Sequence, residues 1–504
     1  MVYLAGVRKD LPYAPEIDEP LFVSRAVSIA SSGDLSPHWF GHPGSTVIYP
    51  LAAIYRLRGL PARPDDLVAI GDLYLTGRVL TVGFALLAIP VTYLLGRAAF
   101  GEPEALAGAW LALLSPVAMD HAQTIRTDSA GVLCTVLGLW LCLRLLAQPT
   151  PRNQLLAGIA IGLGISTRYF LVTLVSVLVL VDLLILLGVP RGPAGTRVRS
   201  PLAGVLLGLA AVAIGFVLTT PFFFPELATA RLDIAHEARS SHPGADGFGY
   251  AGNLLWYLRT AIPGATTPLL ALLSVLGVIV SLWRRRIGPL LLFAFGVIFV
   301  TAVSLSPLHW VRWILPLVPL LALFAAAAIA ALARALASLL GASRAVERAV
   351  GFGLVAAISI GPGIEMVRVA RSEVRPSTTV VARDWIVANL PASSKIAQEF
   401  YTAPLGGTEF SSVKRFSLAR DRRPTPQGII EQGFTFEDYE HEHFDYLMVS
   451  DAIYDRYLFA PGRYPAEAAF YGKLFRSAKL VKEFKPEPDQ RGPTLRIYRL
   501  ESVR

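Results

Sequence analysis

Residues 311–333 read VRWILPLVPLLALFAAAAIAALA, and this run carries a single charged side chain, Arg312. An α-helix needs about 20 apolar residues to cross the roughly 30 Å hydrocarbon core of a bilayer, so the run predicts a membrane span. Arg312 stands near one end of it. A cation at that depth is costly unless it is paired, faces a polar cavity or snorkels to the interface.

Similar runs recur along most of the chain. Hydrophobic residues make up 54% of the sequence and charged residues only 16%, against roughly 25% charged in a soluble globular protein. Counted by length, these runs predict about ten spans. The predicted spans are 73–96, 104–119, 129–147, 154–189 divided into two near Arg168-Tyr169, 201–220, 266–283, 287–305, 311–333 and 349–367.

The composition becomes ordinary and polar after residue 371. Residues 372–504 are numerous enough to form a hydrophobic core of their own. The pattern predicts an amphipathic helix over 378–390, strands at SKIAQEF (394–400) and FDYLMVS (444–450), and a hairpin from 477–486 and 494–501. The expected fold class is a polytopic α-helical membrane protein, residues 1–371, with a soluble C-terminal α/β domain, residues 372–504.

Basic residues occupy alternate connections between the spans, which predicts that those connections face the cytoplasm. They are Arg97, Arg144, Arg152, Arg191, Arg197, Arg199, Arg284, Arg285, Arg286, Arg334, Arg344 and Arg348. The C-terminal domain and the connections 120–128, 221–265 and 306–310 would then lie outside. The same parity makes residues 1–44 an external loop and 45–57 a helix on the membrane surface. No span or signal peptide precedes that loop, so we expect a first helix to be missing.

The net charge of +9 does not indicate a nucleic-acid partner, because the basic residues sit in short clusters beside apolar runs. Cys134 and Cys142 share one apolar run and are expected to pack in the interior. His236, Glu237 and His242 fit no standard zinc spacing. Ordinary loop contacts are the main interpretation of these three residues, and a metal site is the alternative.

Several charged residues are predicted to meet at the outer surface. Asp18 and Glu19 are adjacent in the first loop, where an N-capping pair on a solvated helix is the alternative. Arg126 and Asp128 open a span, and Arg168 and Arg312 lie at outer span ends without an acid within one helical turn. We therefore expect Arg168 and Arg312 to share an anionic ligand, with snorkelling as the alternative.

The order of these motifs resembles a known family. An Asp-Glu pair at 18–19 is followed by His42-Pro43, then RTDS (126–129) and LAGIAIGLGISTRYF (156–170). HWVRWILPLVPLLALFAA (309–326) and ARDWIVANLPASSKIA (382–397) complete the series. Together they resemble the GT-C glycosyltransferases of the protein O-mannosyltransferase and lipid A aminoarabinose transferase type, whose donors are dolichyl- or polyprenyl-phosphate sugars.

The resemblance implies a transferase that moves a sugar from a polyprenyl-phosphate carrier to a lipid, glycan or protein acceptor, at the outer face of the inner (plasma) membrane. In this family the first-loop acid acts as the general base or orients the acceptor, a role that falls to Asp18 with Glu19 beside it. Arg168, where the family usually has lysine, and Arg312 would bind the donor phosphate. The remaining implied substrate-binding residues are His42, Arg126, Asp128 and Tyr169. No cofactor is firmly implied, and a divalent metal is left open.

Two other functions compete with this interpretation. A flippase or transporter of lipid-linked sugars would show inverted repeats and charges near the middle of the bilayer, and the sequence has no evident repeat. A non-catalytic membrane scaffold would not need the Asp-Glu pair or the outward arginines. The C-terminal domain shows no catalytic pattern and is expected to act as a lid or an acceptor-docking domain.

Overall fold

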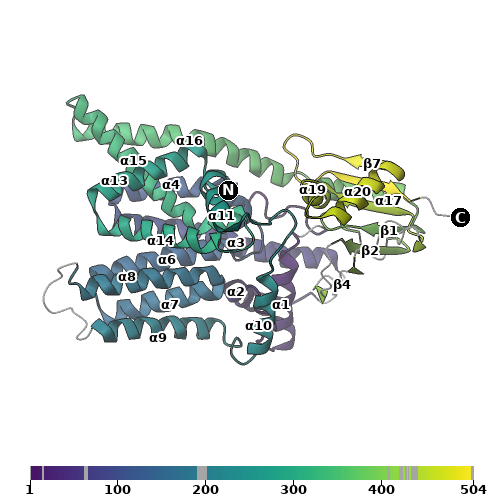
Figure 1. Cartoon of the computed structure of the whole chain (residues 1–504), viewed down its shortest axis with the longest axis horizontal. Coiled ribbons are helices and arrows are strands. Elements are labelled where there is room, and N and C mark those ends of the chain that lie inside the picture. The colour runs from purple at the N-terminus through teal and green to yellow at the C-terminus, as the bar shows by residue number, and fades with distance from the viewer. Residues whose placement is uncertain are drawn as a thin grey trace.

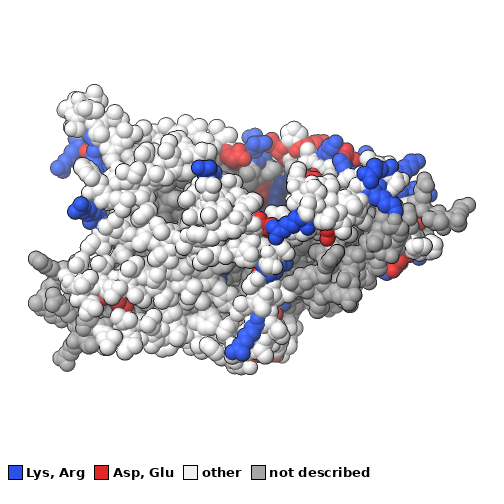
Figure 2. All heavy atoms as spheres, viewed as in Figure 1, with Lys and Arg blue, Asp and Glu red and all other residues white. Residues whose placement is uncertain are grey.

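The computed structural model describes residues 2–13, 16–61, 66–189, 201–405, 409–418, 424–425, 428–429, 431–432 and 441–500. Within these residues, a long helical bundle carries a small sheet domain at one end (Figure 1). The side of the bundle is nearly free of charge over most of its length (Figure 2). Charged side chains gather at the far end of the bundle and around the sheet domain. This distribution fits a multi-pass membrane protein.

The helices that form the bundle are mostly long and apolar. They are α3 (Leu67–Ala99), α4 (Glu102–Leu113), α5 (Pro116–Ala122), α6 (Asp128–Ala147), α7 (Pro151–Thr167), α8 (Leu174–Leu186), α9 (Pro201–Thr219), α11 (Gly249–Trp256), α12 (Ile262–Ala265), α13 (Pro268–Arg284), α14 (Ile287–Ser304), α15 (Val318–Leu339) and α16 (Arg344–Val374).

The described residues contain seven helical segments long and apolar enough to cross a membrane, or nine if two bent pairs are counted. The pairs are α4 with α5, bent by 60°, and the α11–α12 segment with α13, bent by 116°. The predicted division of 154–189 is confirmed, because α7 ends at Thr167 and Arg168 turns into extended backbone before α8. The predicted connection with Arg191, Arg197 and Arg199 lies outside the described residues.

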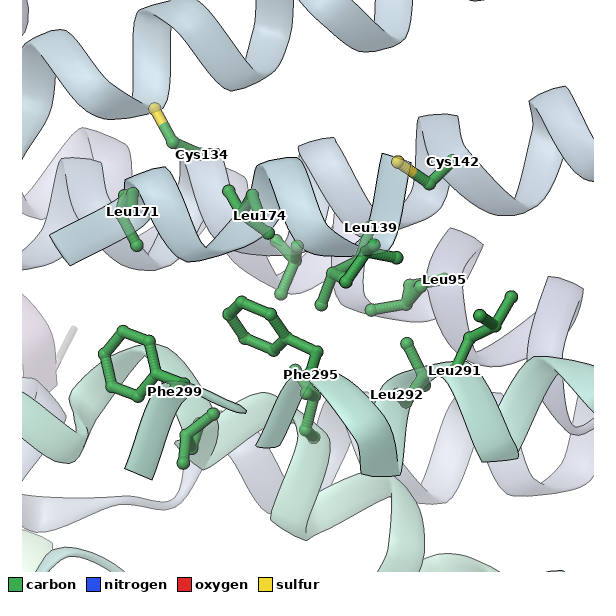
Figure 3. Close-up of a cluster of buried hydrophobic side chains, with 14 of the residues drawn as sticks. Leu95, Cys134, Leu139, Cys142, Leu171, Leu174, Leu291, Leu292, Phe295 and Phe299 are labelled. Carbon is green, nitrogen blue, oxygen red and sulfur yellow. The ribbon is translucent and has the colours of Figure 1, made fainter. Parts of the chain in front are cut away.

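Apolar side chains of α6, α8, α14 and α15 form the main core (Figure 3). Cys134 and Cys142 are buried there and unbridged, which confirms the packing prediction. Where α7 meets α9, glycines permit close approach of the two backbones. A Cβ added at Gly162 would lie 2.3 Å from the Val212 carbonyl oxygen. Small residues at membrane helix contacts allow this kind of packing.

Three helices lie at the bundle end nearest the sheet domain: α1 (Glu19–Ser32), α2 (Ser45–Arg58) and α10 (Leu227–Glu237) (Figure 1). The predicted loop 1–44 thus contains a helix. One face of α2 is buried against α1 and α3, through Val47, Ile48 and Leu51. The segment after α1 is fastened to α10, since the Phe40 amide donates to Asp233 at 2.8 Å.

The sheet domain has the strand order β5-β2-β1-β6-β8-β7. Its elements are α17 (Thr378–Asn389), β1 (Lys395–Gln398), β2 (Ser412–Ser417), β5 (Glu431–Gln432), β6 (Tyr446–Ser450), α19 (Asp451–Leu458), α20 (Pro465–Ser477), β7 (Lys479–Phe484) and β8 (Leu495–Arg499). A separate short pair joins β3 (Pro424–Thr425) and β4 (Gly428–Ile429). The predicted helix, both strands and the antiparallel β7–β8 hairpin are confirmed, whereas β2 was not predicted.

The central strand β1 pairs in parallel with β2 on one side and with β6 on the other. The chain therefore leaves β1 toward one side of the sheet and later returns on its other side. In open α/β sheets, ligands bind in the crevice at the carboxyl ends of strands at such a switch point. The residues that follow β1 and β6 at this edge, Glu399–Tyr401 and then Ile453, Arg456 and Tyr457, line a cavity between the sheet and the helices.

Candidate active site

A cavity of about 900 Å³ lies between the bundle end and the sheet domain. Segments distant in sequence line it: the loop before α1, the α5–α6 connection, the α7–α8 turn, the loop after α10, and the 3-10 helix η4 (Val311–Leu317). The cavity contains seven of the eight predicted site residues. They are Asp18, His42, Arg126, Asp128, Arg168, Tyr169 and Arg312.

Asp18 lies between two arginines of the cavity. Its Oδ2 atom is 2.8 Å from Arg126 Nε and 3.0 Å from Arg312 Nη1, and its side chain is 37% exposed. Enclosure in the cavity would raise the pKa of Asp18, but the positive charges of Arg126 and Arg312 outweigh this effect and lower the pKa to about 2. Asp18 makes no side-chain capping bond to α1, so the N-cap alternative is wrong for it.

Arg168 and Asp128 form a second ion pair in the same cavity. Asp128 begins α6 and Arg168 ends α7, and these two helices pack side by side. Arg168 and Arg312 have no acid within one helical turn in sequence, but each has an acid partner in the fold. Their partners are 40 and 294 residues away in sequence, beyond the reach of a search within one helical turn.

Glu19 points away from the cavity, unlike its neighbour Asp18. It forms a fully buried pair with Arg78, with Nη2 to Oε2 at 2.7 Å and Nε to Oε1 at 2.8 Å. Glu19 Oε1 also accepts a hydrogen bond from the Ile125 amide at 3.0 Å. This bond fixes the backbone next to Arg126, so the Glu19–Arg78 pair helps to position the arginine that contacts Asp18.

Arg78 was not among the predicted residues. It lies inside the predicted span 73–96, five residues from its start, where an arginine is costly unless it is paired. This energetic cost could have predicted, from the sequence alone, that Arg78 faces the protein interior and pairs with an acid. Arg78 also donates to the carbonyl oxygens of Val7 and Lys9, at 3.2 and 2.8 Å. It therefore ties the N-terminal segment to α3.

His42 and Tyr169 also line the cavity. His42 Nε2 lies 3.6 Å from a Glu237 carboxylate oxygen. Enclosure in the cavity lowers the pKa of His42, and the nearby Glu237 opposes that shift. The Tyr169 hydroxyl donates to the Phe40 carbonyl at 2.7 Å, which fixes the hydroxyl and leaves the ring to line the cavity.

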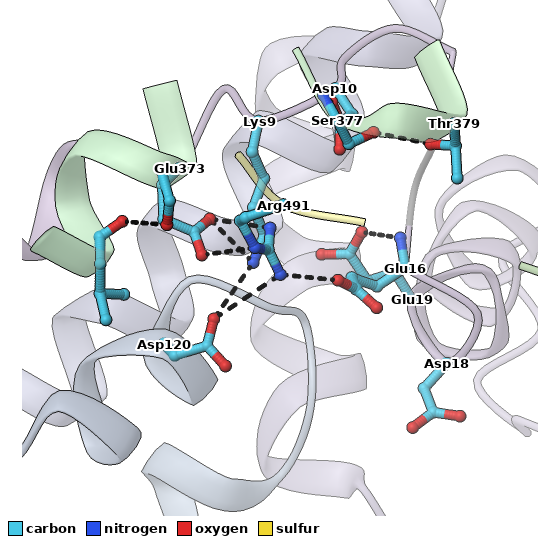
Figure 4. A network of polar contacts seen from close by, with 12 residues as sticks. Lys9, Asp10, Glu16, Asp18, Glu19, Asp120, Glu373, Ser377, Thr379 and Arg491 are labelled. Carbon is cyan, nitrogen blue, oxygen red and sulfur yellow. Dashed lines mark hydrogen bonds and ion pairs between the residues drawn. The ribbon is translucent and has the colours of Figure 1, made fainter. Parts of the chain in front are cut away.

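A second set of charges, which we call the buried network after its buried members Lys9 and Glu373, joins the N-terminal segment to the bundle and the sheet domain (Figure 4). Lys9 is 3.2 Å from Glu373, and Arg491 of the β7–β8 loop reaches Glu373 at 2.9 Å, Glu16 at 3.3 Å and Asp120 at 3.7 Å. Asp18 stands apart from this network in Figure 4. Because Glu16 is two residues before Asp18, the network connects the sheet domain to the segment that carries Asp18.

Across the described residues, no group of three or more His, Cys, Asp or Glu side chains is arranged to hold a metal ion. His236, Glu237 and His242 all line the cavity. Of these, Glu237 pairs with His42, and the His242 ring packs against Trp310 with 5.4 Å between ring centroids.

The sheet domain supplies residues that the sequence patterns did not single out. Glu399 and Tyr401 follow β1, and Arg456 lies on α19, all of them lining the cavity. Burial raises the pKa of Glu399 to about 8, although it bonds Tyr471 and the Ser450 amide.

Comparison with known proteins agrees with this architecture. Residues 68–217 match the family model described as dolichyl-phosphate-mannose-protein mannosyltransferase. No curated protein matches the sequence significantly.

Among solved structures, ArnT from Cupriavidus metallidurans superposes in the apo state with a TM-score of 0.57 at 15% identity, over 98% of this chain and 95% of that one. The same protein bound to undecaprenyl phosphate gives a TM-score of 0.54 at 15% identity and the same coverage. An oligosaccharyltransferase from Archaeoglobus fulgidus, in complex with Zn and sulfate, gives 0.53 at 13% identity, over 98% of this chain and 72% of that one. The family match over residues 68–217 and the fold shared with ArnT and the oligosaccharyltransferase show that this chain is similar to membrane glycosyltransferases.

Proposed function

We propose that the protein transfers a sugar from a polyprenyl-phosphate carrier to a hydroxyl or amine of a lipid, glycan or protein acceptor. The observation that carries this proposal is the ionised Asp18, held between Arg126 and Arg312 in the cavity at the bundle end. A carboxylate can take a proton from an incoming nucleophile, and arginines can bind a phosphate leaving group. The carboxylate that would act as the base and an arginine that would bind the phosphate are therefore in direct contact in this cavity.

The donor side would be formed by Arg168 and Arg312. Both line the cavity and come from connections at the ends of bundle helices, so a phosphate could reach them while its polyprenyl tail lies among the helices. Undecaprenyl phosphate bound to ArnT, which shares this fold, supports a lipid phosphate as donor carrier. The arginines would stabilise negative charge as the sugar–phosphate bond breaks.

Donor binding would also make Asp18 a better base. With Arg126 and Arg312 against it, Asp18 has a pKa of about 2 and little tendency to accept a proton. A phosphate that engages Arg312 offsets part of that positive charge, so the pKa of Asp18 should rise. Asp18 would then take the acceptor's proton, the acceptor oxygen or nitrogen would bond to the anomeric carbon, and polyprenyl phosphate would leave with the bonding electrons.

The side of the membrane is part of the proposal. Arg284, Arg285 and Arg286 end α13 at the bundle end away from the sheet domain, and Arg334 and Arg344 belong to the following helices at that same end. Clusters of this kind favour the cytoplasmic side. We therefore place the cavity and the sheet domain on the outer side of the plasma membrane.

The test is a panel of radiolabelled polyprenyl-phosphate sugars, added to membrane vesicles that contain the protein. At least one donor should lose its label to an acceptor fraction, in right-side-out vesicles and not in sealed inside-out vesicles. Repeating the reaction with a chelator and with added Mg²⁺ or Mn²⁺ determines whether a divalent metal is needed. If no donor is consumed faster than in vesicles without the protein, the proposal is wrong. Activity only in inside-out vesicles would overturn the orientation alone.

A further inference from the structure

Among the described residues, two of the arginines that line the cavity have neither an ion pair nor a hydrogen bond. Arg126, Arg168 and Arg312 each pair with Asp18 or Asp128. Arg239, after α10, and Arg456, on α19, line the same cavity, but no hydrogen bond or ion pair to either is found among the described residues. The Nε atom of Arg239 is buried and has no hydrogen-bond partner. Such a pair of cations in an enclosed space is costly unless an anion joins them.

The loop between α10 and α11 carries Arg239 and packs against Arg456. A Cβ on Gly244 would lie 2.9 Å from Arg456 Cγ, so the loop packs on the arginine's stem. Asp246 of that loop is anchored by Arg463 at 3.1 Å and by the Tyr464 hydroxyl. Burial lowers the pKa of His242, and the positive charges of Arg239 and Arg456 lower it further, to about 4.

Within the described residues, Arg456 forms no ion pair with Glu399, the buried carboxyl group that follows β1. Glu399 accepts hydrogen bonds from the Tyr471 hydroxyl and the Ser450 amide, and burial raises its pKa to about 8. Arg456 instead places its guanidinium over the Tyr401 ring, 5.3 Å from the centroid. Tyr401 adopts a left-handed conformation with φ of 58°, which is uncommon for a non-glycine residue and is found at ligand sites.

Tyr401 and Arg456 follow strands β1 and β6 at the carboxyl edge of the sheet, and Arg239 follows α10; all three line the cavity that also contains Asp18. We propose that Arg239 and Arg456 form a second anion-binding subsite, which holds a phosphate or carboxylate group of the acceptor while the acceptor's nucleophile reaches Asp18. This inference rests on the proposed function for its biological role. The subsite itself can be measured by binding alone. It gives the sheet domain a specific task, the selection of an anionic acceptor.

The experiment uses the full chain in nanodiscs of neutral phosphatidylcholine. Dioctanoyl phosphatidic acid, a lipid phosphate, and glucose 6-phosphate, a soluble one, are titrated with and without saturating undecaprenyl phosphate. The wild type should bind at least one probe when undecaprenyl phosphate already occupies the donor site. Arg239→Gln and Arg456→Gln should each weaken that binding about tenfold, the scale of one charge-assisted hydrogen bond.

Arg476→Gln is the matched control, because Arg476 is an exposed arginine on α20 of the same domain and does not line the cavity. It should change probe affinity less than twofold, and all three variants should keep their affinity for undecaprenyl phosphate. Arg456→Lys keeps the charge without the planar fork and should recover only part of the binding. The subsite is refuted if neither probe binds the wild type, or if the double Arg239→Gln, Arg456→Gln variant binds as well as the wild type. Failure of undecaprenyl phosphate to bind would contradict the proposed donor site instead.

Discussion

Asp18 and Glu19 are neighbours in sequence but belong to two different electrostatic regions. Asp18 belongs to the cavity cluster with Arg126, Arg312 and the Asp128–Arg168 pair, and its side chain is 37% exposed. Glu19 and Arg78 are both 0% exposed. Asp18 and Glu19 both pair with arginine, so the type of partner does not distinguish the two acids. What differs is access: a ligand can compete for the arginines in the cavity, whereas nothing can replace Glu19 at Arg78.

The difference teaches that the cavity cluster can exchange partners during a reaction, while the Glu19–Arg78 pair and the buried network hold the frame. Removing one partner of a fully buried pair leaves an uncompensated charge, which is strongly destabilising. Removing one partner in a solvated cavity costs little stability. The predictions below separate stability from chemistry on this basis.

The largest effect is expected from Glu19→Gln. It leaves the Arg78 guanidinium buried without a counter-charge, so we expect a loss of about 3–5 kcal/mol in the free energy of unfolding. The measurement is SDS-induced unfolding of the detergent-solubilised protein. Asp18→Asn is the matched control and should stay within about 1 kcal/mol of the wild type. Equal losses in the two variants would remove the distinction between the regions.

The next effect concerns donor binding. Arg312→Ala should weaken the affinity for undecaprenyl phosphate by about 1.5–3 kcal/mol, the scale of a hydrogen bond to a charged group. Arg312→Lys should recover part of it, because an ammonium keeps the charge but loses the fork. Arg284→Ala, at the opposite end of the bundle, is the control. If Lys restores the affinity fully, the arginine serves as a general cation, and if Ala changes nothing, it plays no part in donor binding.

A smaller effect is expected from the buried network. Arg491 contacts Glu16, close to Asp18, so Arg491 should act as a positioning residue. Arg491→Gln should lower kcat by roughly three- to tenfold, about one net hydrogen bond, while KM for the donor changes little. Arg368→Gln removes a solvent-exposed pair with Asp489 at the same domain junction and should leave both constants unchanged. A rise in KM with unchanged kcat would argue against positioning.

The smallest effect concerns pH. The folded-state pKa of Asp18 is lowered from 3.8 to about 2, so its stabilising contribution is present above about pH 4 and is lost as pH falls toward 2. From pH 5 to 8 the difference in unfolding free energy between wild type and Asp18→Asn should therefore stay constant. The check is unfolding of both proteins across pH 3–8. A difference that changes between pH 5 and 8 would contradict the lowered pKa.

Much of the architecture could be predicted from local patterns. Apolar runs located the spans, the break at Arg168 divided two helices, and alternation identified β1, β6, β7 and β8. These features depend on residues close in sequence. The residues that meet in the cavity were also foreseen, because the positions of charges at span ends determine which end of the bundle they share.

Pairing and side-chain direction could not be predicted in the same way. Which acid meets Arg312 depends on a contact 294 residues away, and no local period encodes it. The opposite directions of Asp18 and Glu19 follow from the turn that begins α1. The contribution of Tyr401 and Arg456 to the cavity was missed, because these residues become part of it only when the domain sits on the bundle.

The most direct test of the account is sugar transfer by Asp18→Asn in nanodiscs with a radiolabelled polyprenyl-phosphate sugar that the wild type uses. The variant keeps Arg126 and Arg312 but loses the carboxylate that takes the acceptor's proton. The account predicts that donor affinity stays within a few fold while the rate of transfer falls by about 10²–10⁴, the range for loss of a general base. Transfer at a rate near that of the wild type would contradict it.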